Sequence, residues 1–306
     1  MGLGALIPVA IALATAPAPA PAPAPADELA GLTARQKAAL VVVSGLPAPR
    51  GVAGVLVRPW NTGEPRPRGA LVFVDQEGGG VRAFPGLPPA EDARDYATAA
   101  GAAAAGRATG RALRAAGVHV DLAPVLDVAG PLGPRHFARP RLGLAFARGL
   151  ERGGVAACPK HFPGLGSAPI STDERRFVPA RVLPAELRAF RAAVRQGARC
   201  LMVSHAVYPR FSGRRGVTAP GVYRLLRELG FEGVAITDSL GITRGPWPVR
   251  WARRAALAGA DLLLFTSADD AGKAIRALVP LARRGLLDEA VRRVLRFRES
   301  LGLTAP

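Results

Sequence analysis

The 306-residue sequence has few aromatic side chains and only two cysteines. Because aromatics make up only 6% of the chain, small aliphatic side chains must form most of the core. Cys158 and Cys200 are too few for a disulfide framework and lack the spacing of metal ligands. Each lies in an apolar run typical of a buried strand. We therefore expect buried free thiols, with a bridge between the two as the alternative.

Acidic residues are also scarce. The chain has 23 Asp and Glu against 41 Lys and Arg, which gives a net charge of +18. Such a charge suits nucleic acid, an anionic membrane or an acidic wall polymer as a partner. The arginines, however, are spread along expected helices, as at Arg107, Arg111 and Arg114, and form no compact cluster interleaved with aromatics. We interpret them as solvated helix faces and expect no nucleic-acid partner.

The apolar run from Leu3 to Ala16 is too short to span a membrane. It resembles the hydrophobic region of a signal peptide, and its last three residues resemble a cleavage site, although no basic residue precedes the run. Alternating Ala and Pro up to Ala26 indicate a stiff, extended linker. We predict a signal-like segment and Ala-Pro linker at 1–26 and one domain at 27–306. The protein is expected to be secreted or held in the cell envelope, without stable membrane insertion. A tail without function is the alternative.

From Thr33 onward, helical stretches rich in Ala, Leu and Arg alternate with short apolar runs typical of strands. The expected helices cover 33–43, 92–116, 184–197, 220–229, 248–258, 271–284 and 288–300. The expected strands cover 52–57, 71–74, 118–122, 155–158, 200–203, 234–237 and 261–265. Continuous apolar strands separated by helices indicate a parallel sheet covered on both faces. We predict an α/β fold, a TIM-type (β/α)8 barrel trimmed at residues 58–69, where the chain is short and rich in proline.

Ionisable side chains stand at the C-terminal ends of at least five of these strands. They are Asp75, Glu77, Asp121, Asp127, Lys160, His161, His205 and Asp238. In a barrel these ends lie on one face and converge on one pocket, whereas a doubly wound sheet, the alternative fold, gathers ligands at one switch point. The glycines after Glu77 match neither a P-loop nor a dinucleotide-binding loop. The histidines lack metal-ligand spacing, so we expect no metal and no cofactor.

Five segments, in their order and spacing, resemble the N-terminal barrel domain of glycoside hydrolase family 3. They read VDQEGG from Val74, DLAPVLDV from Asp121, KHFPG from Lys160, SH from Ser204 and ITDSLG from Ile236. The resemblance covers nearly everything from residue 32 to residue 303. It implies a retaining glycosidase that forms a covalent glycosyl-enzyme.

The resemblance also implies roles for individual residues. Asp238 is expected to be the catalytic nucleophile that attacks the anomeric carbon. The residues expected to bind sugar hydroxyls are Asp75, Arg135, Lys160 and His161. His205, at a neighbouring strand end, is a further substrate-binding candidate.

The family's acid/base residue is where this sequence departs from the pattern. Many members carry a second domain that supplies it. We expect none here, because the chain ends soon after its last helix, as in single-domain β-N-acetylhexosaminidases. Their acid/base is the His of an Asp-Ser-His triplet after the KHFPG motif, and Ser171-Thr172-Asp173 stands there instead. Asp173 is our catalytic acid/base candidate, and Glu174 is the neighbouring one. The family's arginine after the glycines is displaced as well, with Ala83 at its position and Arg82 one residue earlier.

Three functions therefore remain open. The first is a β-N-acetylhexosaminidase that hydrolyses β-linked terminal N-acetylglucosamine with Asp238 and either Asp173 or Glu174. The second is a β-glucosidase-like hydrolase of the same family. The third is a non-catalytic glycan-binding barrel that lacks the usual His. The intact nucleophile motif favours an enzyme over a binder. In each case we expect a carbohydrate ligand and a monomer.

Overall fold

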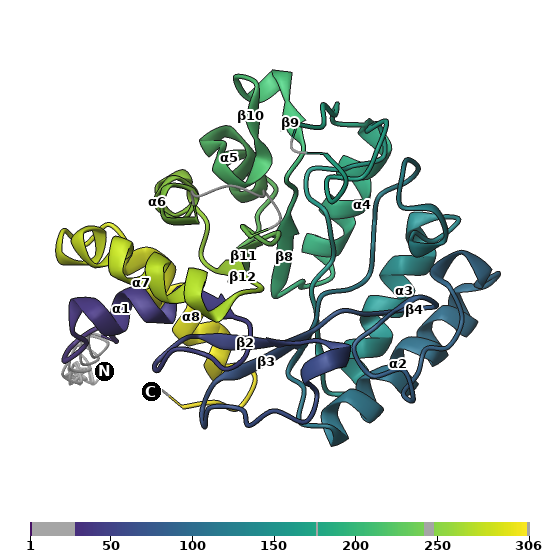
Figure 1. Cartoon of the computed structure of the whole chain (residues 1–306). Helices are drawn as coiled ribbons and strands as arrows, with labels where there is room; N and C mark the ends of the chain where they lie inside the picture. The colour runs from purple at the N-terminus through teal and green to yellow at the C-terminus, as the bar shows by residue number, and fades with distance from the viewer. Residues whose placement is uncertain (2–27, 176, 242–247, 305–306) are drawn as a thin grey trace.

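In the computed structural model, Met1 and residues 28–175, 177–241 and 248–304 are described, so the predicted signal-like segment, apart from Met1, and the whole linker lie outside the described residues. The fold is α/β (Figure 1). The α-helices are α1 (Ala34–Leu40), α2 (Ala99–Ala115), α3 (Pro140–Arg152), α4 (Pro184–Arg195), α5 (Pro220–Glu228), α6 (Pro248–Ala258), α7 (Ala268–Arg283) and α8 (Asp288–Glu299). The short 3-10 helices are η1 (Pro59–Asn61), η2 (Ala93–Asp95), η3 (Gly133–Arg135), η4 (Pro209–Phe211) and η5 (Gly216–Thr218).

The strands are short and largely parallel. They are β1 (Val42–Ser44), β2 (Gly54–Val57), β3 (Leu71–Val74), β4 (Gln76–Gly78), β5 (Val81–Arg82), β6 (Val120–Asp121), β7 (Ala156–Ala157), β8 (Cys200–Val203), β9 (Val207–Tyr208), β10 (Arg214–Arg215), β11 (Val234–Thr237) and β12 (Leu263–Phe265). A six-stranded parallel sheet has the order β12-β1-β2-β3-β6-β7, and β11 pairs with β8 in parallel. The last strand of the chain thus pairs with the first, as in a TIM barrel and unlike a doubly wound sheet.

The strand ladders among the described residues do not form the closed (β/α)8 barrel that was predicted. The strands have a TIM-barrel-like arrangement, divided into the six-stranded sheet and the β8-β11 pair. Isolated bridges join the two sheets, between Phe162 and Val203 on one side and between Ile236 and Leu262 on the other. One cause lies directly after β7, where Pro159 has no N–H to donate to a ladder. The carbonyl of Pro159 still accepts a hydrogen bond from the backbone N–H of Met202 on β8 at 3.0 Å.

Most helices lie around the outside of these strands (Figure 1). All four residues of β2, β3, β8 and β11 are buried, which confirms the expected sheet covered on both faces. The stretch 58–70, which joins β2 to β3, contains only η1 in place of an α-helix, as its prolines predicted. The arginines at 107, 111 and 114 are exposed on α2, in agreement with solvated helix faces.

Several elements differ from the expectation, and the helix expected at 92–116 begins only at Ala99, after η2. The first helix ends at Leu40, and the β-branched run that follows forms β1 instead of a last helical turn. Helix α3 was not expected from the sequence, since its glycines weaken the helical signal. Those glycines serve packing, because a Cβ on Gly149 or Gly153 would collide with the backbone of α2. Small residues therefore let α2 and α3 approach closely, which suits a chain poor in aromatics.

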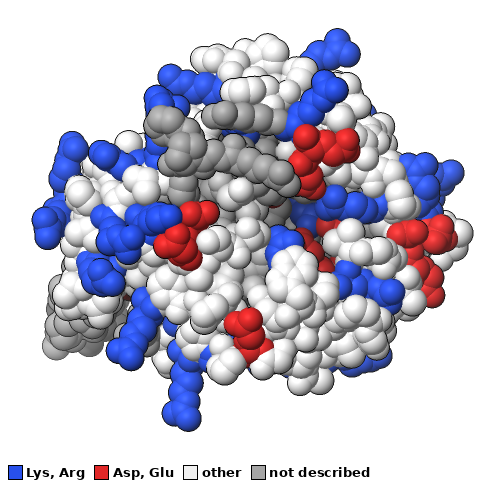
Figure 2. Space-filling view, in the orientation of Figure 1, with Lys and Arg blue, Asp and Glu red and all other residues white. Residues whose placement is uncertain are grey.

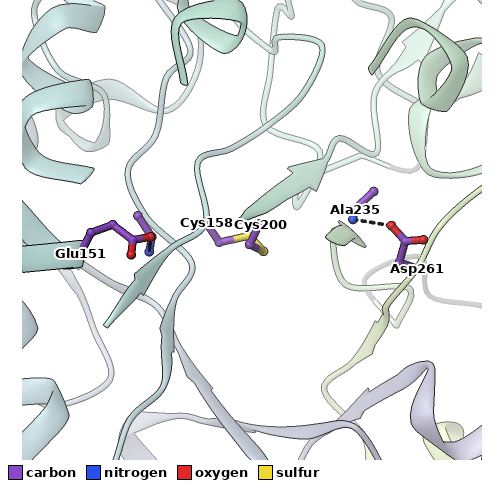
Figure 3. The surroundings of a disulfide bond; sticks show 6 residues. Glu151, Cys158, Cys200, Ala235 and Asp261 are labelled. Carbon is purple, nitrogen blue, oxygen red and sulfur yellow. Dashed lines mark hydrogen bonds between the residues drawn. A yellow bond between two sulfur atoms is a disulfide. The ribbon is translucent and has the colours of Figure 1, made fainter. Parts of the chain in front are cut away.

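The expectation of free thiols was wrong. Cys158 and Cys200 form a disulfide, and their Cα atoms lie 4.6 Å apart (Figure 3). Cys158 directly follows β7 and Cys200 begins β8, so neighbouring strands bring together two residues that are 42 positions apart in the sequence. Both side chains belong to the apolar cluster inside the strands. The bond therefore crosses the place where the two sheets meet without a continuous ladder.

Candidate active site

A cavity of about 300 Å³ lies where the C-terminal ends of the strands meet. Basic and acidic side chains gather around a hollow near the middle of the face in Figure 2, while other basic side chains project around the outline. The cavity is lined by Arg58, Asp75, Val81, Leu122, Leu132, Arg135, Lys160, His161, Leu165, Ser171, Thr172, Asp173, Met202, Asp238, Ser239 and Leu264. The strand-end rule therefore brought together residues from β3, β7 and β11, together with a loop residue, Asp173.

Lys160 is the centre of an ion-pair cluster on one side of this cavity. Its Nζ donates to Asp75 Oδ1 at 2.7 Å and pairs with Glu77 Oε1 at 2.6 Å. Arg135, at the end of η3, holds the same Glu77 through two N–H···O bonds of 2.8 Å. Burial alone would raise the pKa of Glu77, but Lys160 and Arg135 outweigh burial and lower it to about 2. Glu77 is thus charged at neutral pH and held by two cations.

Asp127 holds His161 beside this cluster. Asp127 Oδ2 lies 2.8 Å from His161 Nδ1, and its Oδ1 accepts the backbone N–H of Leu165 at 2.7 Å. Asp127 is 2% exposed and His161 is 6% exposed. The buried carboxylate of Asp127 fixes Nδ1 of His161 as a hydrogen-bond donor. The other ring nitrogen of His161, Nε2, makes no bond to Asp127.

Asp121 lies fully buried next to these groups. Its Oδ1 accepts the backbone N–H of Gln76 at 2.9 Å, and its Oδ2 has no partner within the described part of the chain. Burial raises the pKa of Asp121 well above its usual range, against the opposing effects of the Gln76 N–H and Lys160. Asp121 is therefore suited to be an uncharged acid beside a charged cluster.

Asp238 stands on the other side of the cavity, directly after β11. Its backbone N–H donates to Val203 O on β8 at 2.9 Å. Its Oδ1 accepts the N–H of Ser239 at 2.7 Å, which stabilises negative charge on that oxygen. No ion pair of Asp238 occurs among the described residues, in contrast to the carboxylates around Lys160. The arrangement leaves carboxylate lone pairs facing the cavity.

His205 supports this side without lining the cavity. It is 2% exposed, and its Nε2 lies 2.7 Å from the carbonyl oxygen of Ser239, the residue after Asp238. Nε2 must then carry the proton. Burial lowers the pKa of His205, although Asp238 opposes that effect, so the neutral imidazole is favoured. The ring fixes the backbone beside Asp238.

Asp173 lines the cavity on an exposed turn of the loop after the KHFPG motif. Its backbone N–H donates to Ser171 Oγ at 3.2 Å. Glu174 is exposed as well and is not among the lining residues. Of the two acid/base candidates, only Asp173 shares the cavity with Asp238.

Some residues of the site were not singled out from the sequence. Arg58 lines the cavity directly after β2, and the strand-end rule that selected the others would have found it. Its guanidinium also lies 5.5 Å from the ring centre of Trp60, an exposed side chain. Glu186 on α4 contacts the loop that carries Asp173, and its place on a helix offered no signal.

Neither a metal cluster nor a membrane span is found within residues 28–175, 177–241 and 248–304. No group of three or more His, Cys, Asp or Glu side chains is arranged there to hold a metal ion. None of the helices described combines the length and the apolar character needed to cross a bilayer.

Comparison with known proteins identifies the family. Residues 62–297 match the model of the glycosyl hydrolase family 3 N-terminal domain. A protein named beta-hexosaminidase from Methylococcus capsulatus is 34% identical over 232 residues, which span 67% of this chain and 69% of that protein.

Solved structures agree. A glycoside hydrolase family 3 beta-N-acetylglucosaminidase from a Paenibacillus species superposes with a TM-score of 0.76 at 27% identity, over 90% of this chain and 64% of that chain. The beta-N-acetylhexosaminidase of Beutenbergia cavernae has a TM-score of 0.75 at 27% identity, over 88% of this chain and 99% of that chain. The chain therefore belongs to glycosyl hydrolase family 3 and is a glycoside hydrolase.

Proposed function

We propose that this chain is a retaining exo-glycosidase that releases β-linked terminal N-acetylglucosamine from cell-wall or amino-sugar glycans. The observation that carries the proposal is one cavity that joins Asp238, a carboxylate without an ion pair to any described residue, to the charged cluster around Lys160. The names of the relatives, beta-hexosaminidase and beta-N-acetylglucosaminidase, support the choice of sugar.

The cluster is suited to bind the non-reducing sugar. Asp75, Arg135, Lys160 and His161 all line the cavity and offer donors and acceptors that already hold fixed positions. Hydroxyl groups that bridge such groups gain charge-assisted hydrogen bonds without ordering the protein. His205 contributes indirectly, since it holds the backbone of Ser239.

The reaction then proceeds in two steps. Asp238 attacks the anomeric carbon while Asp173 donates its proton to the departing glycosidic oxygen, which leaves a glycosyl ester on Asp238. In the second step Asp173 takes a proton from water, and the resulting hydroxide equivalent displaces Asp238 from the same carbon. Two inversions give net retention. Asp173 is preferred to Glu174 because it lines the cavity.

Two other functions stay as alternatives. A β-glucosidase-like activity differs only in the group that the cavity accepts at the second sugar carbon. A glycan-binding protein without catalysis is favoured by one observation, the exposure of Asp173, because an exposed carboxyl lacks the burial that would make it a strong general acid at neutral pH.

The experiment is hydrolysis of a nitrophenyl β-N-acetylglucosaminide and of the matching β-glucoside by the wild type, Asp238→Ala and Asp173→Ala. We expect the first substrate to be preferred, with a loss of about 10³-fold or more in Asp238→Ala. In Asp173→Ala, kcat and KM should fall together, because an activated leaving group needs little acid but the glycosyl-enzyme still needs a base. No turnover of either substrate by the wild type would favour the binding protein.

The location, the oligomeric state and the cofactor requirement of the enzyme are proposed from the sequence. We infer export to the cell envelope or medium, a monomeric state and activity without a cofactor or metal. We also infer that the strands close into one eight-stranded ring through the bridges that flank β8 and β11, since this would bring all the site residues to one end.

A further inference from the structure

Three consecutive residues after the KHF segment are each held by a buried side chain. Tyr208 Oη donates to the carbonyl of Gly164 at 2.8 Å, and Asp127 Oδ1 accepts the N–H of Leu165 at 2.7 Å. Glu186 Oε1 accepts the N–H of Gly166, also at 2.7 Å. These side chains come from β9, from the segment after β6 and from the first turn of α4. Side chains from three segments of the chain therefore hold the backbone of residues 164–166.

Glu186 is the unusual member of this group. It is fully buried, although carboxylates in the first turn of a helix usually face water. Its Oε1 also lies 3.3 Å from the N–H of Val128, and no cation pairs with it in the described part of the chain. A Cβ on Gly164 or on Gly166 would collide with its carboxyl group, so the two glycines allow the carboxyl to lie flat against the loop.

Beyond Gly166 the loop is also held by Ser167, whose Oγ donates to the carbonyl oxygen of Arg181 at 2.9 Å and accepts the Arg181 N–H at 2.6 Å. Its far end is tied to β9, where the N–H of Val207 donates to Val178 O at 2.8 Å and the N–H of Ala180 donates to Val207 O at 2.9 Å. Between these two anchors Asp173 is exposed, although Ser171 and Thr172 before it are buried, and its backbone N–H donates to Ser171 Oγ at 3.2 Å. The anchor at Gly166 is therefore one of the contacts that set the position of the Asp173 carboxyl group in the cavity.

We propose that Glu186 is a positioning residue of the reaction, which anchors the loop at Gly166 so that Asp173 stays in reach of the glycosidic oxygen. The proposal rests on the function proposed above. Glu186 is not among the residues that line the cavity and would act on the chemistry only through the loop that carries Asp173.

Protonation of Glu186 is expected to modulate the anchor. Burial, followed by the charge of Asp127, raises its pKa from 4.5 to about 7. The groups that face it are Asp127, which is paired with His161, and the neutral hydroxyl of Tyr208. Because the folded pKa is raised, the stabilisation is fully present below pH 4.5 and is lost as pH rises through about 7. The bonds from the Gly166 and Val128 N–H groups oppose this shift, so the anchor bond itself is stronger to the ionised carboxyl group.

The test compares leaving groups in Glu186→Ala and Glu186→Gln. Without the anchor, kcat/KM for an alkyl β-N-acetylglucosaminide, which needs acid assistance, should fall by about 10- to 100-fold. For the nitrophenyl glycoside, kcat/KM should change by less than about threefold, while kcat and KM fall together. Glu186→Gln keeps an acceptor oxygen and should restore most of the alkyl activity. An equal fall for both substrates would overturn the proposal.

Two further measurements keep the outcome decisive. Glu151→Ala is the control, since the Glu151 side chain likewise accepts a backbone N–H, that of Ala157 at 3.1 Å, but Glu151 is not among the residues that line the cavity. Amide hydrogen exchange at Leu165 and Gly166 should become faster in Glu186→Ala and stay unchanged in Glu151→Ala. If Glu186→Ala does not fold, Glu186→Asp, which is one methylene too short to reach Gly166, takes its place.

The hydrogen-exchange measurement also distinguishes a failure of the proposal for Glu186 from a failure of the proposed glycosidase function. A wild type that turns over neither substrate would refute the glycosidase, whereas faster exchange would still establish the anchor. Unchanged exchange together with an unchanged ratio between the two substrates would refute the role of Glu186 and leave the glycosidase intact.

Discussion

The two sides of the cavity hold their ionisable groups in different ways. On the side of β3 and β7, Asp75, Glu77, Arg135 and Lys160 form a continuous set of ion pairs between 2.6 and 2.8 Å. On the side of β8 and β11, Asp238 has a backbone donor and no ion pair within the described residues.

The difference matches two chemical tasks. A binding group gains from a fixed position, because the substrate then finds donors and acceptors already ordered. A nucleophile must form a bond to carbon, and an ion pair with Lys or Arg would compete for the lone pair that attacks. The paired side is therefore suited to hold the sugar, and the unpaired side to react with it.

Breaking the paired side at its centre should have the largest effect on stability. Lys160→Met leaves Asp75 and Glu77 without their shared cation, and Glu77 is 5% exposed. Removal of one partner from a buried pair costs about 3–5 kcal/mol of unfolding free energy. Urea unfolding at pH 7 measures this loss of unfolding free energy. Lys37→Met, which removes a peripheral pair with Asp288, is the control and should cost less than about 1 kcal/mol. Equal losses of unfolding free energy in the two variants would mean that the buried cluster stabilises the fold no more than a peripheral ion pair does.

The disulfide connects the two sides of the cavity, since it joins β7 to β8. Replacement of both Cys158 and Cys200 by Ser should lower the free energy of unfolding by about 2–4 kcal/mol, because the oxidised chain closes a loop with a sequence separation of 42 residues. Thermal unfolding of the wild type with and without reductant gives the same comparison. A reductant-insensitive midpoint in the wild type, with no free thiol by titration, would contradict this expectation.

Acid should loosen the paired side selectively. The pKa of Glu77 is about 2 in the folded protein against 4.5 normally, so its stabilising effect is present above pH 4.5 and disappears as pH falls toward 2. The stability attributable to this group is about 3 kcal/mol. Unfolding free energies of the wild type and of Glu77→Gln, measured between pH 6 and pH 3, test this predicted loss of stability. The wild type should lose stability more steeply, and parallel curves would count against the assignment.

The smallest effect is expected for Asp121, which sits on the paired side but whose uncharged form is favoured. Asp121→Asn should change the free energy of unfolding at pH 7 by less than about 1 kcal/mol, since an amide replaces a neutral acid of the same shape. A loss close to that of Lys160→Met would show instead that Asp121 is a charged member of the cluster.

The sequence predicted the strand-end residues on both sides of the cavity better than it predicted the contacts between strands and helices. Asp75, Lys160, His161 and Asp238 all follow apolar strands, so a rule about strand ends was enough to bring them to one cavity. The break after β7 and the disulfide depend on how two strands align in space, which no spacing along the chain encodes. Helix α3 was missed because its glycines serve contact with α2 and weaken its own helical signal.

Glu186 shows the same limit on a single side chain. A Glu near the start of a helix ordinarily caps or is solvated, and only the folded loop reveals that this one is buried against Gly166. Which of Asp173 and Glu174 faces the cavity likewise depends on the turn at 171–174, whose conformation neighbouring residues in the sequence do not determine.

The most direct test of the account is to trap the glycosyl-enzyme. Asp173→Ala should accumulate it when mixed with an activated aryl β-N-acetylglucosaminide, because the base for the second step is missing. After acid quenching, mass spectrometry of the intact protein and of its peptides should find one N-acetylhexosamine residue attached to Asp238. Continued turnover without an adduct, or an adduct on any other residue, would contradict the assignment of Asp238 as the nucleophile.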